Sequence, residues 1–346
     1  MIARLPRPFA FLAAALLAAL CIWCLTTRPP PVKLAAKGGY TDVMLYKDIT
    51  RAVAAGKPYH QAAAELQRAH FYPLKPFFTM RLPTLTKLAA WLGWAGAQKL
   101  AYGLAGAAIF AWVIALPDRF NAPERVLAGV AVAFAASVVT SQGLLALHEY
   151  WGGLLLALAL AGVVGWPRRW WLVLVPAGLA LGLRELALPF VLLALAFALG
   201  ERRWREAGAW LALIIVFALA MAWHAQLVLP QARPGDLHSQ GWNAMQGLSG
   251  FLKAVIYTSG LQQLPLPWAM LAAMLPLFGW AALQGRAGAF CVILFAGYAL
   301  MIGMFSRADT FYWGGIVLPG YFVGFALLPR AIGQLAQAML GRRRSW

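Results

Sequence analysis

The sequence predicts an all-α membrane protein with about ten transmembrane helices, and three observations support this fold class. Of its 346 residues, 62% are hydrophobic and only 12% are charged, whereas soluble proteins average roughly half apolar and about a quarter charged residues. The apolar residues form long runs of the length that crosses a bilayer. Sixteen tryptophans accompany them, as expected of aromatic belts at the membrane interface. These features exclude a soluble enzyme, a disordered chain and a disulfide-rich scaffold.

The first predicted element is an apolar run at residues 9–25, which we interpret as a retained span. The run is long and lacks the small residues of a signal-peptide cleavage site. We expect residues 1–346 to form a single membrane-embedded domain with two longer outer loops, 26–98 and 225–265. Hydropathy predicts nine further spans, at residues 99–116, 126–141, 151–166, 170–183, 186–200, 207–224, 266–283, 288–304 and 315–330.

The distribution of arginines predicts the orientation of these spans. The short outer loops carry only Arg184 or Arg307. The segments assigned to the inside carry many more, namely Arg4, Arg7, Arg119, Arg125, Arg168, Arg169, Arg202, Arg203, Arg205, Arg286, Arg330 and the arginines at 342–344. The positive-inside rule then places both termini in the cytoplasm. We attribute the net charge of +18 to topology and contact with membrane lipids, because no segment resembles a nucleic-acid-binding module.

The stretch 170–200 is apolar except for Arg184 and Glu185 near its middle. A single helix of this length would run about 46 Å, which is much longer than the ~30 Å hydrocarbon core. We therefore predict two short helices that meet at these two residues, in a water-filled recess. Charges at membrane depth are costly and usually mark a functional site.

The outer loop 26–98 is predicted to contain short amphipathic helices. Residues 41–55 place apolar side chains on one helical face, Gly56-Lys57-Pro58 ends this helix, and residues 59–70 form a second one. A further helix is expected to lead back to the membrane after residues 81–84. The loop holds ten basic and three acidic residues. This excess fits either contact with lipid head groups or a cradle for an anionic lipid-linked substrate.

Charged residues gather at the predicted outer side. Three outer turns each bring a pair, namely His148-Glu149, Arg184-Glu185 and Arg307 with Asp309. Each could be a structural ion pair, but together with Asp42 they indicate a shared polar chamber. No Gly-x-Ser-x-Gly, His-Glu-x-x-His or Walker-type motif occurs, so serine hydrolase, zinc protease and ATP-driven chemistry are unsupported.

Group transfer fits the polar inventory better. One carboxylate can deprotonate a hydroxyl, and arginines can hold the charge of a lipid-phosphate leaving group. We expect the donor phosphate to be bound by Arg307, Arg184, Lys75 and Arg81. We expect the sugar or the acceptor to be bound by His148, Glu149, Glu185, Asp309, Tyr312 and Trp313.

Two motifs in the first outer loop resemble a known group. Asp42-x-x-x-Tyr46, followed by Gly56-x-x-Tyr59, is similar to the start of GT-C glycosyltransferases, in particular the bacterial polyprenyl-phosphate-mannose-dependent mannosyltransferases. The segments 148–153 and 307–314 resemble the same group. The resemblance implies an inverting transferase that moves a sugar such as mannose from a polyprenyl phosphate to a periplasmic glycan or glycolipid, with Asp42 as the catalytic base.

The same resemblance bears on cofactors. Many relatives carry a second acidic residue beside the base, where this chain has Val43. A mechanism without a metal or other cofactor is therefore favoured. The alternative function is a secondary transporter or a flippase for a lipid-linked or anionic substrate, although no internal repeat of the kind found in many transporters is visible.

Overall fold

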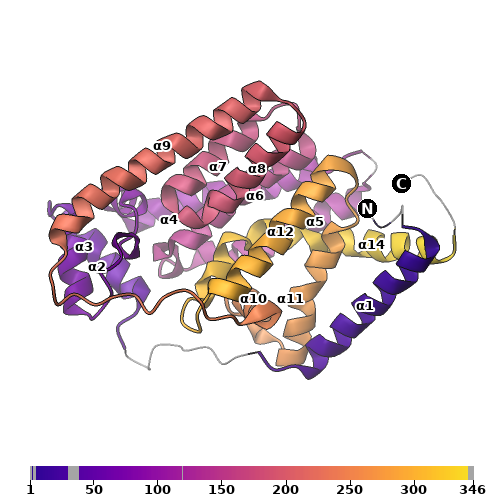
Figure 1. Ribbon diagram of the computed structural model, residues 1–346, viewed down its shortest axis with the longest axis horizontal. Helices are drawn as coiled ribbons and strands as arrows, with labels where there is room; N and C mark the ends of the chain where they lie inside the picture. The colour runs from indigo at the N-terminus through magenta and orange to yellow at the C-terminus, as the bar shows by residue number, and fades with distance from the viewer. Residues whose placement is uncertain (1, 3–4, 30–38, 119, 342–346) are drawn as a thin grey trace.

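The computed structural model describes residues 2, 5–29, 39–118 and 120–341 (Figure 1). In this part of the chain the regular secondary structure is helical, apart from one isolated β-bridge between Lys75 and His238. The helices are α1 (Arg7–Thr26), α2 (Asp42–Ala54), α3 (Tyr59–Ala69), α4 (Thr84–Ala115), α5 (Ala122–Ala136), α6 (His148–Gly165), α7 (Trp171–Leu183), α8 (Leu188–Gly200), α9 (Trp204–Val228), α10 (Gly247–Tyr257), α11 (Leu266–Trp280), α12 (Gly285–Phe305), α13 (Leu318–Tyr321) and α14 (Val323–Met339).

Six helical segments of the described chain are long and apolar enough to cross a membrane. They are Arg7–Thr26, Phe77–Ala115, Ala122–Thr140, His148–Gly165, Trp204–Gln231 and Gly285–Phe305. The shorter apolar helices α7, α8, α10 and α11 accompany them. The described chain is thus all-helical with six helical segments suited to cross a membrane, and the topology with ten spans stays a prediction.

The two short helices predicted within residues 170–200 are present. Helix α7 ends at Leu183, a single 3₁₀ turn covers Glu185–Ala187, and α8 begins at Leu188. The two amphipathic helices predicted in the first outer loop are present as α2 and α3. The Thr41 hydroxyl begins α2 by accepting a hydrogen bond from the Met44 amide, 3.3 Å away, as an N-cap residue does.

Helix α4 begins at Thr84, well before the apolar segment predicted from residue 99. Gly93 breaks this helix with a φ of 68°, a left-handed conformation that glycine adopts without steric cost. The predicted loop 26–98 therefore includes the first turns of α4. Trp91, on those turns, is 80% exposed, which is typical of a tryptophan at a membrane interface.

Helix α6 forms the centre of the molecule and is buried along most of its length. It packs against α4, α7 and the 3₁₀ segment Phe311–Ile316. A side chain at Gly153 would place its Cβ 2.2 Å from the Gly315 carbonyl oxygen. The absence of side chains at these glycines is therefore what allows the 3₁₀ segment to lie directly on α6.

The loops sort into two groups, one at each end of the helices. The predicted inner loops meet through the Arg286–Glu201 pair at 2.7 Å and the Arg330–Glu124 pair at 2.7 Å. Helix α9 begins beside Glu201 and ends in contact with α3. The predicted outer loops therefore meet at the other end, with α2 and α3, at the left of Figure 1. Which end faces the cytoplasm stays a prediction from the arginine pattern.

A histidine pair ties α3 to α9. The His60 Nε2 and His224 Nδ1 atoms are 3.2 Å apart, and His224 Nε2 is 3.1 Å from the Met80 carbonyl oxygen. Because that carbonyl can only accept, His224 donates from Nε2 and accepts at Nδ1, so His60 is the donor in the pair. Burial, with smaller contributions from His224 and Lys87, lowers the pKa of His60 to about 4.

We predict that acid loosens the contact between α3 and α9. Because the folded-state pKa of His60 lies below its ordinary value of 6.5, the full stabilising contribution is present above pH 6.5 and is lost as the pH falls toward 4. The melting temperature of the detergent-solubilised protein should therefore decrease over this range. It should decrease less steeply in His60→Gln than in the wild type or in the control His238→Gln. Equal slopes in all three proteins would contradict the assignment.

Candidate functional site

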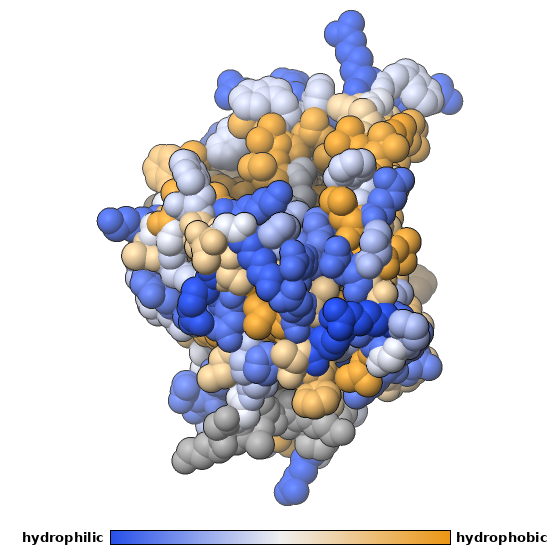
Figure 2. All heavy atoms as spheres, turned by 90° about the vertical axis from the view of Figure 1, so that its left-hand side faces the viewer, coloured by the Kyte–Doolittle hydropathy of each residue, from blue (hydrophilic) through white to orange (hydrophobic). Residues whose placement is uncertain are grey.

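A cavity of about 1240 Å³ opens at the end of the molecule that carries α2 and α3. Its walls come from α2, the segment before α4, the 3₁₀ turn Ser137–Thr140 that follows α5, and two stretches of loop, 237–242 and 307–313. Figure 2 looks at this end and shows hydrophilic side chains gathered across it, with hydrophobic ones concentrated toward the top of the view. The cavity thus collects segments that are far apart in the sequence.

Tyrosines dominate the aromatic lining. Of the ten tyrosines in the chain, seven line the cavity, namely Tyr40, Tyr46, Tyr59, Tyr72, Tyr150, Tyr257 and Tyr312. A tyrosine offers an apolar ring face together with a hydroxyl that donates and accepts hydrogen bonds, a combination that suits a sugar ring with its hydroxyl groups.

Sequence reasoning did not assign a role to Tyr40, Tyr72 or Tyr257, although a signal was available. Only Tyr102, Tyr298 and Tyr321 fall inside predicted spans. The other seven tyrosines lie in outer loops or at the outer ends of spans. The concentration of tyrosines at the predicted outer side is the sequence signal that indicates a tyrosine-lined site there.

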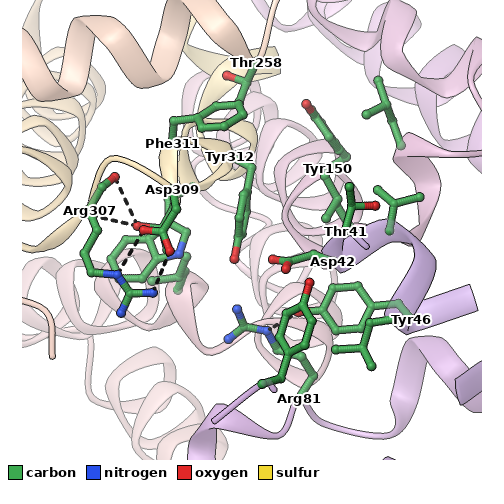
Figure 3. Close-up of a pocket in the computed structure, with 18 of the residues that line it drawn as sticks. Thr41, Asp42, Tyr46, Arg81, Tyr150, Thr258, Arg307, Asp309, Phe311 and Tyr312 are labelled. Carbon is green, nitrogen blue, oxygen red and sulfur yellow. Dashed lines mark hydrogen bonds and ion pairs between the residues drawn. The ribbon is translucent and has the colours of Figure 1, made fainter. Parts of the chain in front are cut away.

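Asp42, at the first residue of α2, points into the cavity near Arg81 and Tyr312 (Figure 3). Burial, followed by the negative charge of Asp42 and a hydrogen bond to its carboxylate, raises the pKa of the Tyr72 phenol. Asp42 makes no ion pair with any residue that the structure describes. Each of the other ten acidic residues of the chain is paired with an arginine or a lysine. The cavity therefore contains one carboxylate whose charge no described cation neutralises.

Arg81 lies beside Asp42 and is held from behind by a chain of ion pairs. Its Nη1 is 3.3 Å from Glu185 Oε1, and its Nε donates to the Tyr46 hydroxyl at 3.2 Å. Glu185 also pairs with Arg184, whose Nε lies 2.7 Å from Glu149 Oε1. The series Glu149–Arg184–Glu185–Arg81 alternates in sign. It joins α6, the turn after α7 and the segment before α4.

Three predicted ligand-binding residues lie behind the cavity wall. Arg184 is 0% exposed, His148 is 1% exposed and Glu149 is 2% exposed, and none of them lines the cavity. The structure therefore does not bring these three residues to the cavity surface with the other predicted site residues. The carboxylates of Glu149 and Glu185 both pair with the Arg184 guanidinium. The His148 ring packs edge-on against Tyr46, with ring centroids 5.2 Å apart. Arg184 is connected to the cavity lining through Glu185 and Arg81, and His148 through Tyr46.

Lys75 is also displaced from its predicted role, since it does not line the cavity. Its Nζ donates to the Pro234 carbonyl oxygen at 3.3 Å. Its backbone carbonyl accepts from the Ser239 amide at 2.7 Å. Lys75 thus fixes the second outer loop rather than a phosphate.

The stretch 232–242, which we call the strap, forms one wall of the cavity. Besides Lys75, it is held by Arg68, whose Nε and Nη2 donate to the Asp236 carboxylate at 2.6 and 2.8 Å. These hydrogen bonds lower the pKa of Asp236 to about 2. At its far end, Trp242 packs on Phe78 with ring centroids 5.2 Å apart.

Arg307 and Asp309 lie across the cavity from Asp42, with the Tyr312 ring between them (Figure 3). The pair is bidentate, because Nε and Nη2 of Arg307 donate to the two carboxylate oxygens at 3.0 and 3.1 Å. The remaining Nη1 donates to the Gly241 carbonyl oxygen at 3.0 Å and so reaches the strap. The predicted residues Asp42, Arg81, Glu185, Arg307, Asp309, Tyr312 and Trp313 thus line one cavity.

Among the described residues, no three His, Cys, Asp or Glu side chains come close enough to hold a metal ion. The chain matches no family model, no curated protein and no solved structure. The resemblance to GT-C enzymes therefore rests on the motifs around Asp42, His148 and Arg307 alone.

We predict that Arg184→Ala destabilises the protein strongly. The substitution leaves the buried Glu149 carboxylate without its partner, which costs about 3–5 kcal/mol in comparable buried pairs. Arg51→Ala is the matched control, because that side chain is 78% exposed in its pair with Asp48 and such surface pairs contribute about 0–1 kcal/mol. Thermal unfolding in detergent compares the two. Similar melting temperatures for both variants would show that the Arg184 ion pairs do not stabilise the packing behind the cavity.

Proposed function

We propose that this protein is a GT-C-like glycosyltransferase of a bacterial inner membrane. It moves a sugar from a polyprenyl-phosphate donor to a hydroxyl of a periplasmic glycan or glycolipid. The observation that supports this proposal best is the unpaired Asp42 carboxylate, which faces a tyrosine-lined cavity with an arginine on the opposite side. A carboxylate without a cationic partner is available to take a proton.

The proposed reaction is a single displacement at the anomeric carbon. The Asp42 carboxylate takes the proton of the acceptor hydroxyl while that oxygen forms a bond to C1 of the sugar. The bond between C1 and the phosphate oxygen breaks, and its electron pair leaves with the phosphate. The products are the glycosylated acceptor, with inverted configuration at C1, and a polyprenyl phosphate. The proton on Asp42 then passes to solvent.

The positions of the side chains suit such an in-line geometry. Attack and departure occur on opposite faces of the sugar, so the base and the cation that holds the leaving group should face each other across it. Asp42 and Arg307 are separated in this way, with Tyr312 between them (Figure 3). We assign the acceptor to the side of Asp42, the sugar to Tyr312 and Trp313, and the donor phosphate to Arg307.

Arg81 has a different role in this proposal. It lies beside Asp42 and is already bound to Glu185 and Tyr46. We assign Arg81 to orienting the acceptor hydroxyl beside Asp42, while Glu185 and Tyr46 hold the Arg81 guanidinium in place.

We predict that Asp42→Asn abolishes transfer and leaves folding and donor binding nearly intact, because the amide has the same shape but cannot take a proton. Turnover of a radiolabelled polyprenyl-phosphate sugar should fall at least about a hundredfold, the typical contribution of a general base. Asp48→Asn is the matched control, since Asp48 lies on the same helix but is paired with Arg51 and does not line the cavity.

Two outcomes would count against the proposal. Near-normal turnover in Asp42→Asn would remove this residue from the role of base. Exchange of the labelled lipid across a proteoliposome membrane, without cleavage of the bond to phosphate, would identify the protein as a transporter or flippase instead.

A further inference from the structure

The Arg307–Asp309 pair has the geometry of an occupied phosphate site. Two parallel N–H···O bonds of 3.0 and 3.1 Å join the guanidinium edge to the two carboxylate oxygens. Arginine binds a phosphate group with the same fork geometry. The carboxylate of Asp309 therefore occupies the edge of Arg307 on which a lipid phosphate would bind.

The two partners differ in how easily they can move. The Asp309 side chain is 47% exposed, whereas that of Arg307 is 22% exposed and remains tethered to the strap through the Gly241 carbonyl oxygen. The turn between them is fixed by its backbone, because the Arg307 amide donates to the Thr310 hydroxyl at 2.8 Å. The carboxylate is therefore the more accessible of the two groups, and the guanidinium is held by more of the surrounding chain.

A second cation lies behind this pair. Lys253 is 0% exposed, donates to the Gln246 side-chain oxygen, and is close enough to Asp309 for the two charges to interact. Gln246 in turn donates to the Ser306 carbonyl oxygen at 2.8 Å, next to Arg307. Two cations and one carboxylate leave this end of the cavity with a net positive charge. Among the described residues, displacement of Asp309 would leave these two cations without a carboxylate, which favours the binding of an anion there.

We propose that Asp309 is an internal place-holder that competes with the lipid phosphate for Arg307. The carboxylate binds Arg307 while the site is empty, gives way to the phosphate of the incoming donor, and returns when the polyprenyl phosphate leaves. Asp309 is thus a specificity-determining residue that limits phosphate affinity and promotes product release. This inference rests on the proposed function for the identity of the lipid phosphate, but its competition step requires no transfer.

The test is equilibrium binding of polyprenyl phosphate to the detergent-solubilised full chain, with uncharged polyprenol as the reference ligand. Asp309→Asn removes the competing charge, so we expect its affinity for polyprenyl phosphate to rise about tenfold, the equivalent of about 1.4 kcal/mol, with no change for polyprenol. Asp309→Glu should restore the wild-type affinity. Asp118→Asn is the matched control, because Asp118 is exposed and its ion pair with Arg125 lies at the opposite end of the molecule from the cavity.

The contrary results are distinct. If Asp309 only orients Arg307, Asp309→Asn will weaken polyprenyl-phosphate binding or leave it unchanged, and either result overturns the place-holder. In the transfer assay the place-holder further predicts that both KM and kcat fall in Asp309→Asn, because the product leaves more slowly. A tenfold gain in phosphate affinity in a chain without any transferase activity would support the place-holder and refute the proposed function. Normal transfer with unchanged phosphate affinity in Asp309→Asn would support the proposed function and refute the place-holder.

Discussion

The ion pairs of Arg184 are the interaction on which the arrangement of the cavity depends. A buried guanidinium is tolerated only when carboxylates neutralise it, and Glu149 and Glu185 do so from α6 and from the turn between α7 and α8. Glu185 then extends the network to Arg81 in the first outer loop. One buried charge thus fixes the central helix, a helical turn and the loop that carries Asp42. This network explains why a loop of short amphipathic helices can hold a carboxylate in a defined position.

The pattern of ion pairs also distinguishes Asp42 from the other acidic residues. In a chain with so few charges, each carboxylate that stays ionised near the membrane needs a partner, and ten of the eleven acidic residues have one among the described residues. The exception faces the cavity. Asp309 differs from Asp42 in this respect, because its ion pair with Arg307 is exposed enough to exchange. The proposal therefore gives the two carboxylates different roles, one as base and one as competitor for the phosphate.

Much of this organisation could be predicted from the sequence, because it depends on local patterns. Hydropathy located many of the helices, and the length of the 170–200 stretch required the turn at Arg184 and Glu185. Hydropathy missed α10, which lies in the predicted loop 225–265, and the predicted span 315–330 is divided among a 3₁₀ segment, α13 and α14. The charge pairs at the outer turns marked the end where the cavity lies. The directions of the side chains could not be predicted, since they depend on packing between distant segments. Arg184 bonds to Glu149, 35 positions away, and this contact turns both residues away from the cavity. Similarly, the role of Lys75 depends on the strap, which is distant in sequence.

In the proposed mechanism, Asp42 and Arg307 face each other across a bound sugar phosphate. A structure of the protein with a non-hydrolysable polyprenyl-phosphate sugar analogue tests this most directly. We expect the phosphate to bind Arg307 in place of the Asp309 carboxylate and the sugar to pack on Tyr312. The face of C1 opposite the phosphate should be turned toward Asp42. A phosphate bound beside Arg81 and Asp42, or a ligand outside the cavity, would contradict it.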